Sequence, residues 1–313
     1  MDKKLKNIAV LGAGKMGSGI AQFFATKGYD VKVIYVHDDK AVGNGKSIPT
    51  NLQFLCDNGV IKADEIPAII SRISFVDTIQ EAADADIVFE CIVENLAIKQ
   101  EYFRQLDEFY SPDVILASNT SAISITEIAA LSKHKERILG AHFWDPPYII
   151  PLVEVIKTDY VSLGAVTRVY DLMNATGKKP VLVEKDVPGF LANRMQHALF
   201  REALSIVQNG IASAEDVDIS IKYGFGMRLG ISAPIEVMDR GGLDLTYSIH
   251  NYLFPHIEST TEPLPILTQK MQEDKLGFKS GEGLMKWSEE DIKRSYENLL
   301  GGLIKVASAL DRL

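Results

Sequence analysis

The sequence is poor in cysteine and has no long hydrophobic run. Its two cysteines, Cys56 and Cys91, form no C-x-x-C pair and are too few for a disulfide framework, so a reducing compartment is expected. No stretch approaches the run of about 18 apolar residues that a membrane-spanning helix requires. The apolar part of the N-terminal segment, Ile8–Leu11, is too short for a secretory signal. We therefore expect a cytoplasmic protein that makes no membrane contact.

Positive charge is also scarce. The chain carries 33 Lys and Arg against 42 Asp and Glu, a net charge of −9. This balance argues against a polyanion-binding surface, so nucleic acid is not an expected partner, although a local basic pocket is compatible with it. Hydrophobic residues make up 46% and charged residues 24% of the 313 residues, which suits a globular protein of two domains. We predict no metal site.

The first half of the chain alternates short apolar runs with longer amphipathic stretches. The runs predicted to be strands are Asn7–Leu11, Val31–Val36, Ile87–Cys91, Val114–Ser118 and Ile138–His142. The stretches predicted to be helical are Lys15–Lys27, parts of Lys40–Ile73, Leu96–Tyr110 and Ser124–Leu131, the last opened by a capping box of Ser124 and Glu127. Strands that alternate with helices indicate a doubly wound, mostly parallel sheet covered on both faces, an α/β architecture.

The second half of the chain has a different pattern. After Phe190 it reads as helical, with one helix running to Gly210, another opened by Ser213, and a final amphipathic helix capped by Ser288. No comparable series of strands follows. We therefore place a domain boundary near Val187, which gives an α/β domain over residues 1–187 and an all-α domain over residues 188–313.

The strongest single motif is a glycine-rich turn directly after the first predicted strand. Gly12, Gly14 and Gly17 form G-x-G-x-x-G, with Lys15 and Met16 between the last two glycines. Gly12 permits the tight turn, Gly14 lets the backbone approach a pyrophosphate, and Gly17 lets the helix pack closely on the strand. The following helix offers unpaired N–H groups to the phosphates. The motif predicts a Rossmann domain that binds a dinucleotide.

The residue that should hold the adenosine ribose is out of place. An acidic residue is expected at the end of the second strand, but that position falls on Tyr35, while Asp38 and Asp39 come slightly later. Either the strand continues and Asp38 serves, or the ribose is bound differently. No fixed positive charge lies between Ile34 and Asp39 to receive the extra phosphate of NADP, so NAD is the expected cofactor.

Four polar residues stand in contexts that suggest catalysis. Ser121 lies in the loop after the fourth predicted strand, His142 ends the next strand, Glu154 lies inside an apolar run, and Asn193 lies on the first helix after the boundary. A histidine paired with a buried carboxylate is a good general base. Taken singly, each residue also has a structural explanation: loop hydrogen bonding, a satisfied histidine, an ion pair or a helix cap.

At these residues the chain resembles the 3-hydroxyacyl-CoA dehydrogenase family over nearly its whole length. The resemblance is carried, in order, by GAGKMGSGIA, ECIVENLAIKQEYF, SNTSAISITEIA, AHFWDPPYIIPLVEVIKT, DVPGFLANR and GFKSGEGLMKW. It implies that His142 is the catalytic acid/base, that Glu154 orients it, and that Ser121 and Asn193 contact the substrate hydroxyl. It also implies that Glu94 and Lys99 contact the nicotinamide and its ribose.

The chain departs from the family pattern at several positions. Tyr35 replaces the usual ribose aspartate, Asp145 stands beside the cofactor site where asparagine is common, and Leu284 and Met285 replace an aromatic pair. The His142–Glu154 segment and the extra C-terminal helix are more similar to the branch that contains L-gulonate 3-dehydrogenase, L-carnitine dehydrogenase and lambda-crystallin.

The resemblance implies an NAD-dependent oxidoreductase of fatty acid metabolism that interconverts 3-hydroxyacyl-CoA and 3-ketoacyl-CoA. The alternative is the same chemistry on a free 3-hydroxy acid, and a remoter one is a non-catalytic nucleotide-binding protein. A CoA substrate would need basic contacts, for which Lys46, Lys62 and Arg72 are candidates, although they could equally form a solvated face. The apolar residues of the helical domain, together with the resemblance, predict a homodimer; they include Phe200, Ile206, Phe225, Ile235 and Leu253.

Overall fold

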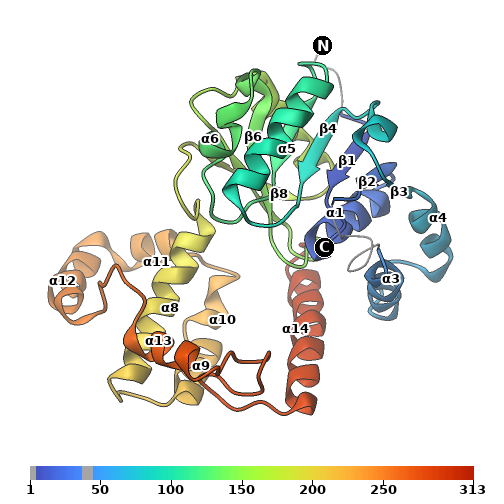
Figure 1. Ribbon diagram of the computed structural model, residues 1–313. Coiled ribbons are helices and arrows are strands. Elements are labelled where there is room, and N and C mark those ends of the chain that lie inside the picture. Colours follow the sequence, from blue (N-terminus) through green and yellow to red (C-terminus); the bar gives the residue numbers. More distant parts are fainter. Residues whose placement is uncertain (1–4, 37–44) are drawn as a thin grey trace. The chain divides into compact units, whose positions relative to one another are not determined.

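The computed structural model describes residues 5–36 and 45–313 (Figure 1). Its contacts divide the chain into two compact units, a first unit of Met1–Asn193 with Leu299–Leu313 and a second unit of Arg194–Asn298. The last fifteen residues, which we had assigned to the helical domain, thus pack with the first unit. Within the described ranges, no helix has both the length and the apolar character needed to cross a membrane.

The first unit is built on one eight-stranded sheet in the order β3-β2-β1-β4-β5-β6-β7-β8. Neighbouring strands are parallel except for the β6–β7 pair, which is antiparallel. The strands are β1 (Ile8–Leu11), β2 (Val31–Ile34), β3 (Ile73–Val76), β4 (Ile87–Glu90), β5 (Ile115–Ser118), β6 (Ile138–Phe143), β7 (Leu152–Ile156) and β8 (Lys179–Val183). The predicted doubly wound, mostly parallel sheet is confirmed.

Helices cover both faces of this sheet. Since successive strand residues point to opposite sides, neighbouring residues of one strand pack into different apolar cores. Val10 packs in one apolar core with residues of α1 (Lys15–Thr26) and α7 (Leu163–Ala175), whereas Leu11 packs in another with residues of α5 (Leu96–Phe109) and α6 (Ile125–Ile128). The central strands are buried on both faces, which explains why they read as continuous apolar runs in the sequence.

The elements differ from the predicted ones in several places. The strands β3 and β8 were not predicted, β7 was noted only as the apolar run that contains Glu154, and β2 ends at Ile34 rather than at Val36. The capping box at α6 is only half present. Ser124 Oγ accepts from the Glu127 N–H at 3.3 Å, but it donates in turn to Asp186 Oδ2 at 2.6 Å, and the same aspartate oxygen accepts from the Thr126 N–H at 2.7 Å. Asp186 therefore supplies a further acceptor at the start of α6, for the Ser124 hydroxyl and the Thr126 N–H.

The insertion after β2 contains two helices, α3 (Ser47–Asp57) and α4 (Ile66–Ser71). The C-terminal part of α14 (Glu289–Ala309) belongs to the same unit: Ile304 is buried in an apolar cluster with Leu55 of α3 and Ile149. The extra C-terminal helix thus contributes to the core around α3.

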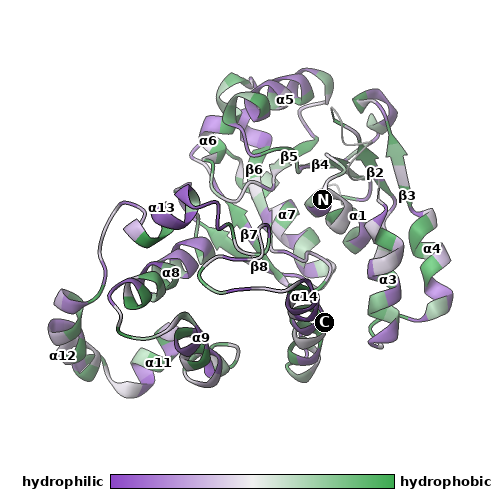
Figure 2. Cartoon of the chain, turned by 60° about the horizontal axis from the view of Figure 1, so that its bottom comes forward, coloured by the Kyte–Doolittle hydropathy of each residue, from purple (hydrophilic) through white to green (hydrophobic). Residues whose placement is uncertain are grey.

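The second unit is helical, as predicted. Its helices are α8 (Ala192–Gln208), which begins at the end of the first unit, α9 (Ala214–Tyr223), α10 (Gly226–Leu229), α11 (Pro234–Gly241), α12 (Leu243–Leu253), α13 (Pro265–Gln272) and the start of α14. The predicted helix ends are confirmed: Gly210 has φ of +66°, Ser213 accepts from the Asp216 N–H, and Ser288 accepts from the Asp291 N–H. Figure 2 shows hydrophobic residues on α8, α9 and α12.

Candidate active site

The glycine-rich turn joins β1 to α1, at the point where the strand order reverses, since β1 lies between β2 and β4. Ligands of doubly wound sheets bind at this crevice. Gly12 has φ of +103°, and a Cβ at Gly17 would lie 1.9 Å from the Gly12 oxygen, so both positions require glycine. Beside Gly14 a Cβ would meet nothing within 4 Å, which leaves the backbone open to a pyrophosphate.

A cavity of about 320 Å³ lies beside this turn; its lining residues are Gly14, Lys15, Met16, Val36, Cys91, Ile92, Val93 and Ile98. No acidic residue occupies the first turn of α1, so its N–H groups are not opposed by a carboxylate of that turn. Burial raises the pKa of the Cys91 thiol above its usual range, so this wall of the cavity is uncharged. The glycine turn, the helix start and the cavity together fit the pyrophosphate of a dinucleotide.

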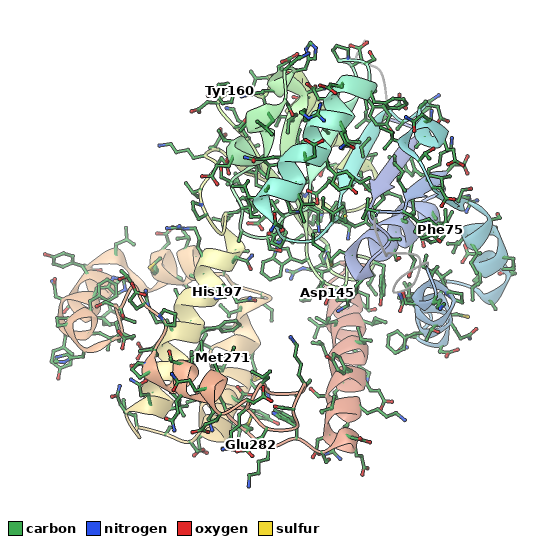
Figure 3. All side chains as sticks on the ribbon, viewed as in Figure 1. Phe75, Asp145, Tyr160, His197, Met271 and Glu282 are labelled. Atoms are coloured by element: carbon green, nitrogen blue, oxygen red, sulfur yellow. The ribbon has the colours of Figure 1, made fainter. Side chains whose placement is uncertain are left out.

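Two predicted cofactor residues, Lys15 and Asp145, form an ion pair of 2.5 Å between Nζ and Oδ2. Lys15 lies between the last two glycines of the turn, and Asp145, labelled in Figure 3, follows β6; their side chains are 74% and 46% exposed. The pair connects the phosphate-binding turn to the segment that carries His142. An exposed pair of this kind contributes little to stability, about 0–1 kcal/mol.

The position predicted for the ribose residue has no carboxylate. Tyr35, the residue directly after β2, stacks on Phe75 of β3 with ring centroids 5.5 Å apart. Asp38 and Asp39 lie outside the described residues.

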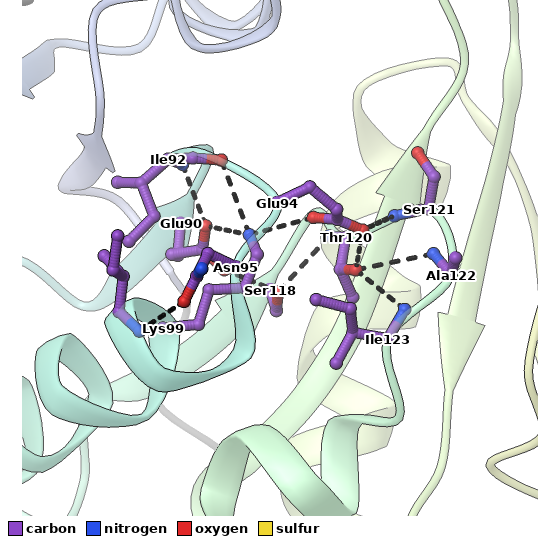
Figure 4. Close-up of polar contacts among 11 residues, drawn as sticks. Glu90, Ile92, Glu94, Asn95, Lys99, Ser118, Thr120, Ser121, Ala122 and Ile123 are labelled. Carbon is purple, nitrogen blue, oxygen red and sulfur yellow. Dashed lines mark hydrogen bonds and ion pairs between the residues drawn. The ribbon is translucent and has the colours of Figure 1, made fainter.

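A buried polar network connects the ends of β4 and β5 (Figure 4). The Lys99 Nζ donates to Glu90 Oε1 at 2.5 Å, and their side chains are 1% and 0% exposed. Glu90 Oε2 accepts from Ser118 Oγ at 2.6 Å, because the two residues are directly opposite in the β4–β5 register. Lys99, predicted to contact the cofactor ribose, is thus enclosed by protein.

The second carboxylate of this network is Glu94, which accepts from Thr120 Oγ1, from the Ser121 N–H at 3.2 Å, and pairs with Lys99 at 3.3 Å. Burial raises the pKa of Glu94, but the bond from Thr120 and the charge of Lys99 outweigh it, so the pKa lies below its usual range. Glu94 is therefore ionised at neutral pH and fixes the backbone of Ser121.

His142 and Glu154 lie directly opposite each other in the antiparallel β6–β7 pair, with 2.7 Å between Nδ1 and Oε2. Their side chains are 6% and 0% exposed. Among the residues that the structure describes, Nε2 of His142 has no hydrogen-bond partner, whereas the bond at Nδ1 fixes the tautomer. The ring therefore presents Nε2 for proton transfer.

The other oxygen of Glu154 connects this pair to the start of α8. Oε1 accepts from the N–H groups of Leu191 and Ala192, both at 2.9 Å. Burial raises the pKa of Glu154, but the bonds from His142 and from these two N–H groups outweigh it, so the pKa lies below its usual range. The buried carboxylate is thus held in its charged form.

The next residue of α8, Asn193, donates from Nδ2 to the Ser121 carbonyl at 3.0 Å. The four residues predicted to be catalytic are therefore connected. Asn193 binds Ser121, and its neighbour Ala192 donates to Glu154. Glu154 in turn contacts His142. The Ser121 side chain is exposed.

Several polar residues of the site were not predicted. Glu90 accepts from Lys99, and Thr120 donates to Glu94. Asn119 Oδ1 accepts from the Phe143 N–H at 2.8 Å. Trp144 donates to Glu154. Only Glu90 had a signal in the sequence, an acidic residue at the end of an otherwise apolar strand.

The basic residues considered for a CoA substrate differ in their surroundings. Lys46 and Lys62 are exposed, whereas Arg72 donates from Nη1 to the Ala25 carbonyl at the end of α1 at 3.3 Å.

Comparisons with known proteins agree with this geometry. Residues 7–187 match the family model described as the NAD binding domain of 3-hydroxyacyl-CoA dehydrogenase, and residues 189–287 match its C-terminal domain. A 5-formyl-3-hydroxy-2-methylpyridine 4-carboxylate 5-dehydrogenase of Mesorhizobium japonicum is 33% identical over 98% of this chain and 99% of its own. A probable 3-hydroxybutyryl-CoA dehydrogenase of Bacillus subtilis is 38% identical over 92% of this chain and 99% of its own.

A solved structure of a dehydrogenase of the same pyridine acid, described as an NAD+-dependent dismutase, matches with a TM-score of 0.89 and 32% identity, covering 98% of this chain and 99% of the other. NAD is accordingly the cofactor of this oxidoreductase. Both family models match, and they cover most of the chain in the expected order. The chain belongs to the 3-hydroxyacyl-CoA dehydrogenase family.

Proposed function

We propose that the chain interconverts a secondary alcohol and the corresponding ketone, with His142 as the acid/base. The observation that carries this proposal is the buried His142–Glu154 pair, which occupies Nδ1 and leaves Nε2 without a protein partner among the described residues. NAD, when bound, supplies the acceptor for the hydride that leaves the carbinol carbon. Nε2 takes the hydroxyl proton in that direction and returns it in the reverse, while Glu154 stabilises the protonated ring.

Ser121 and Asn193 are proposed to bind the reacting oxygen, where charge changes most during the reaction. Their placement is supported by two contacts: Glu94 holds the Ser121 backbone, and Asn193 donates to the Ser121 carbonyl. One of the two Nδ2 protons of Asn193 remains for the substrate. The four residues thus act as one positioned group rather than as separate side chains.

For the substrate we propose a 3-hydroxyacyl-CoA thioester. The support is the family itself and the Bacillus subtilis relative, whose name gives 3-hydroxybutyryl-CoA as its substrate. A second candidate is a hydroxy acid without CoA. The support for a substrate without CoA is the match to the pyridine 4-carboxylate dehydrogenase, whose named substrate is a free acid that carries a formyl group; this match covers 98% of this chain against 92% for the Bacillus relative.

Steady-state turnover separates these candidates. We expect oxidation of NADH with acetoacetyl-CoA, at a kcat/KM far above that of NADH oxidation with free acetoacetate and of NAD+ reduction with the aldehyde 5-formyl-3-hydroxy-2-methylpyridine 4-carboxylate. Turnover of only the acids would support the second candidate. No turnover of any of the three would support the non-catalytic alternative, provided that the protein binds NADH. The variant His142→Gln is the control for hydride transfer at this site.

We also propose that the chain forms a homodimer through its helical unit. Large apolar side chains of this unit are exposed: Phe200 is 48% exposed, Ile235 69%, Tyr247 70% and Met271 62%. Figure 3 labels Met271 among them. Exposed apolar area of this extent is usually covered by a second subunit. Light scattering at micromolar concentration should give twice the mass of one chain, and the mass of a monomer would contradict the proposal. A cytoplasmic location and a role in fatty acid metabolism remain predictions.

A further inference from the structure

Trp144 makes a contact with the His142–Glu154 pair that no part of the proposed function uses. It follows β6 directly, two positions after His142. The indole Nε1 donates to Glu154 Oε2 at 3.3 Å, the same oxygen that His142 Nδ1 contacts at 2.7 Å. The two rings are tilted by 55° with centroids 5.7 Å apart.

This contact completes the hydrogen bonding of a carboxylate that water does not reach. Glu154 is 0% exposed, and its two oxygens accept four bonds, two at Oε1 from backbone N–H groups and two at Oε2 from His142 and Trp144. Because no solvent replaces a lost donor, removal of one bond changes the charge that the oxygen offers to the others.

We propose that Trp144 is a positioning residue that sets the proton affinity of His142 through their shared oxygen of Glu154. The inference rests on the proposed role of His142. An indole N–H that shares the oxygen draws part of its negative charge away from the histidine ring. Without that donor the carboxylate holds the protonated ring more tightly. With Trp144 present, the His142 ring therefore releases its proton more readily and can both accept and donate a proton.

The other groups around His142 do not provide this control. On another side of the ring lies Phe190, with centroids 5.8 Å apart, which carries no charge. The loop after β5 brings Ser121, whose N–H binds Glu94, and Glu94 is paired with Lys99. Among the described residues, Glu154 is the charged group in hydrogen-bond contact with His142. A change at Trp144 leaves these other charges in place.

The test is the variant Trp144→Phe, which keeps an aromatic ring and removes only the donor. In the alcohol-oxidising direction, where His142 must be unprotonated, we expect the acidic limb of the pH profile of kcat/KM to move to higher pH by about half a unit. This shift corresponds to about 0.7 kcal/mol, a fraction of a whole hydrogen bond to a carboxylate, because only the coupling between the two donors is lost. The matched control is Trp287→Phe, the same substitution at the only other tryptophan of the sequence, which packs on Phe278 in the second unit. An equal profile for Trp144→Phe and the wild type would overturn the proposal.

A measurement without substrate separates this proposal from the proposed function. In protein labelled at its six histidines, the His142 ring signal is identified by its loss in His142→Gln. Its titration midpoint should rise in Trp144→Phe and not in Trp287→Phe; an unchanged midpoint overturns the proposal. A shifted midpoint in a protein that turns over no substrate supports the proposal and refutes the proposed function instead.

If Trp144→Phe does not fold, the wild type still decides the question. The two tryptophans give two indole N–H signals, and Glu154→Gln identifies the one that contacts Glu154. That signal should shift with pH at the same midpoint as the His142 ring. An indole signal that does not respond to the protonation of His142 contradicts the proposal.

Discussion

Lys99 and Glu90 form an ion pair of 2.5 Å that is closed to solvent on both sides, since their side chains are 1% and 0% exposed. The pair joins α5 to the end of β4, beside the cavity predicted for the cofactor. Lys99 therefore acts on the site through Glu94 and Ser121, whose backbone Glu94 holds.

The variant Lys99→Met is expected to destabilise the protein by about 3–5 kcal/mol, because it leaves the buried Glu90 carboxylate without its partner. The matched control is Arg104→Met on the same helix. Arg104 pairs with Glu101 and Glu108 at the surface, so its loss should change stability by about 1 kcal/mol or less. Urea unfolding followed by circular dichroism measures both. Equal midpoints for the two variants would show that the Lys99 pair is not closed to water.

The variant His142→Gln should lower turnover by roughly 10²–10⁴-fold, the usual contribution of a general acid/base. NADH binding, followed by fluorescence, should stay close to that of the wild type, since His142 contacts Glu154 and not the glycine turn. Glu154→Gln should lower turnover less, because the base remains while its orientation is disturbed. Near-normal turnover of His142→Gln on the preferred substrate would exclude this residue as the base.

The sheet was predictable because its signals are local. Buried parallel strands read as apolar runs, and Gly12, Gly14 and Gly17 mark the turn after the first of them. The pairing of His142 with Glu154 was only implied by the family resemblance, since the register that makes them opposite depends on a turn of eight residues between β6 and β7.

The polar connections within the site were not predictable from the sequence. The strand β3 was missed because only four residues, partly exposed at the sheet edge, form it. The pairing of Lys99 was not predictable because a sequence does not show that Glu90, nine positions earlier, turns toward the same interior. The contact of Lys99 with the cofactor stays a prediction. The contacts of Asp186 at the start of α6 were not predictable for the same reason, since this acceptor for the Ser124 hydroxyl and the Thr126 N–H is distant in sequence.

The glycine turn gives a prediction with an internal control. Gly14→Ala places a methyl group where no protein atom lies within 4 Å, so stability should be unchanged, within about 0.5 kcal/mol. NADH affinity should nevertheless fall, because the methyl group enters the space beside the backbone that the pyrophosphate needs. Gly17→Ala should lower both stability and affinity, because its Cβ would meet the Gly12 oxygen at 1.9 Å. Gly164→Ala, on the exposed side of α7, should change neither affinity nor turnover.

Thermal melting and NADH titration of the three variants measure these effects. A Gly14→Ala protein with wild-type affinity would place the pyrophosphate elsewhere than at this turn. A Gly17→Ala protein with wild-type stability would show that the turn relaxes without cost.

Lys178 is a second buried lysine of the first unit, 4% exposed, at the start of the segment that leads into β8. Its Nζ donates to the carbonyl oxygens of Pro147 and Ile150, at 2.5 and 2.7 Å, and lies over the Phe23 ring at 4.1 Å from the centroid. The lysine thus holds the backbone of the segment between β6 and β7 through these two bonds. Burial, and to a lesser degree the charge of Lys27, lowers the pKa of Lys178 to about 7.

This pKa predicts how stability depends on pH. Between about pH 7 and pH 10.5 the unfolded chain keeps the Lys178 proton, whereas the folded chain releases it. Since the unfolded state then binds more protons, this group makes the free energy of unfolding rise with pH across that window, by at most about 1.4 kcal/mol per pH unit. Urea unfolding at pH 7, 8 and 9 should show this slope reduced in Lys178→Met and unchanged in Lys179→Met, the exposed neighbour. Parallel pH dependences of the wild type and Lys178→Met would mean that the two carbonyl bonds and the Phe23 ring keep Lys178 protonated throughout, in spite of its burial.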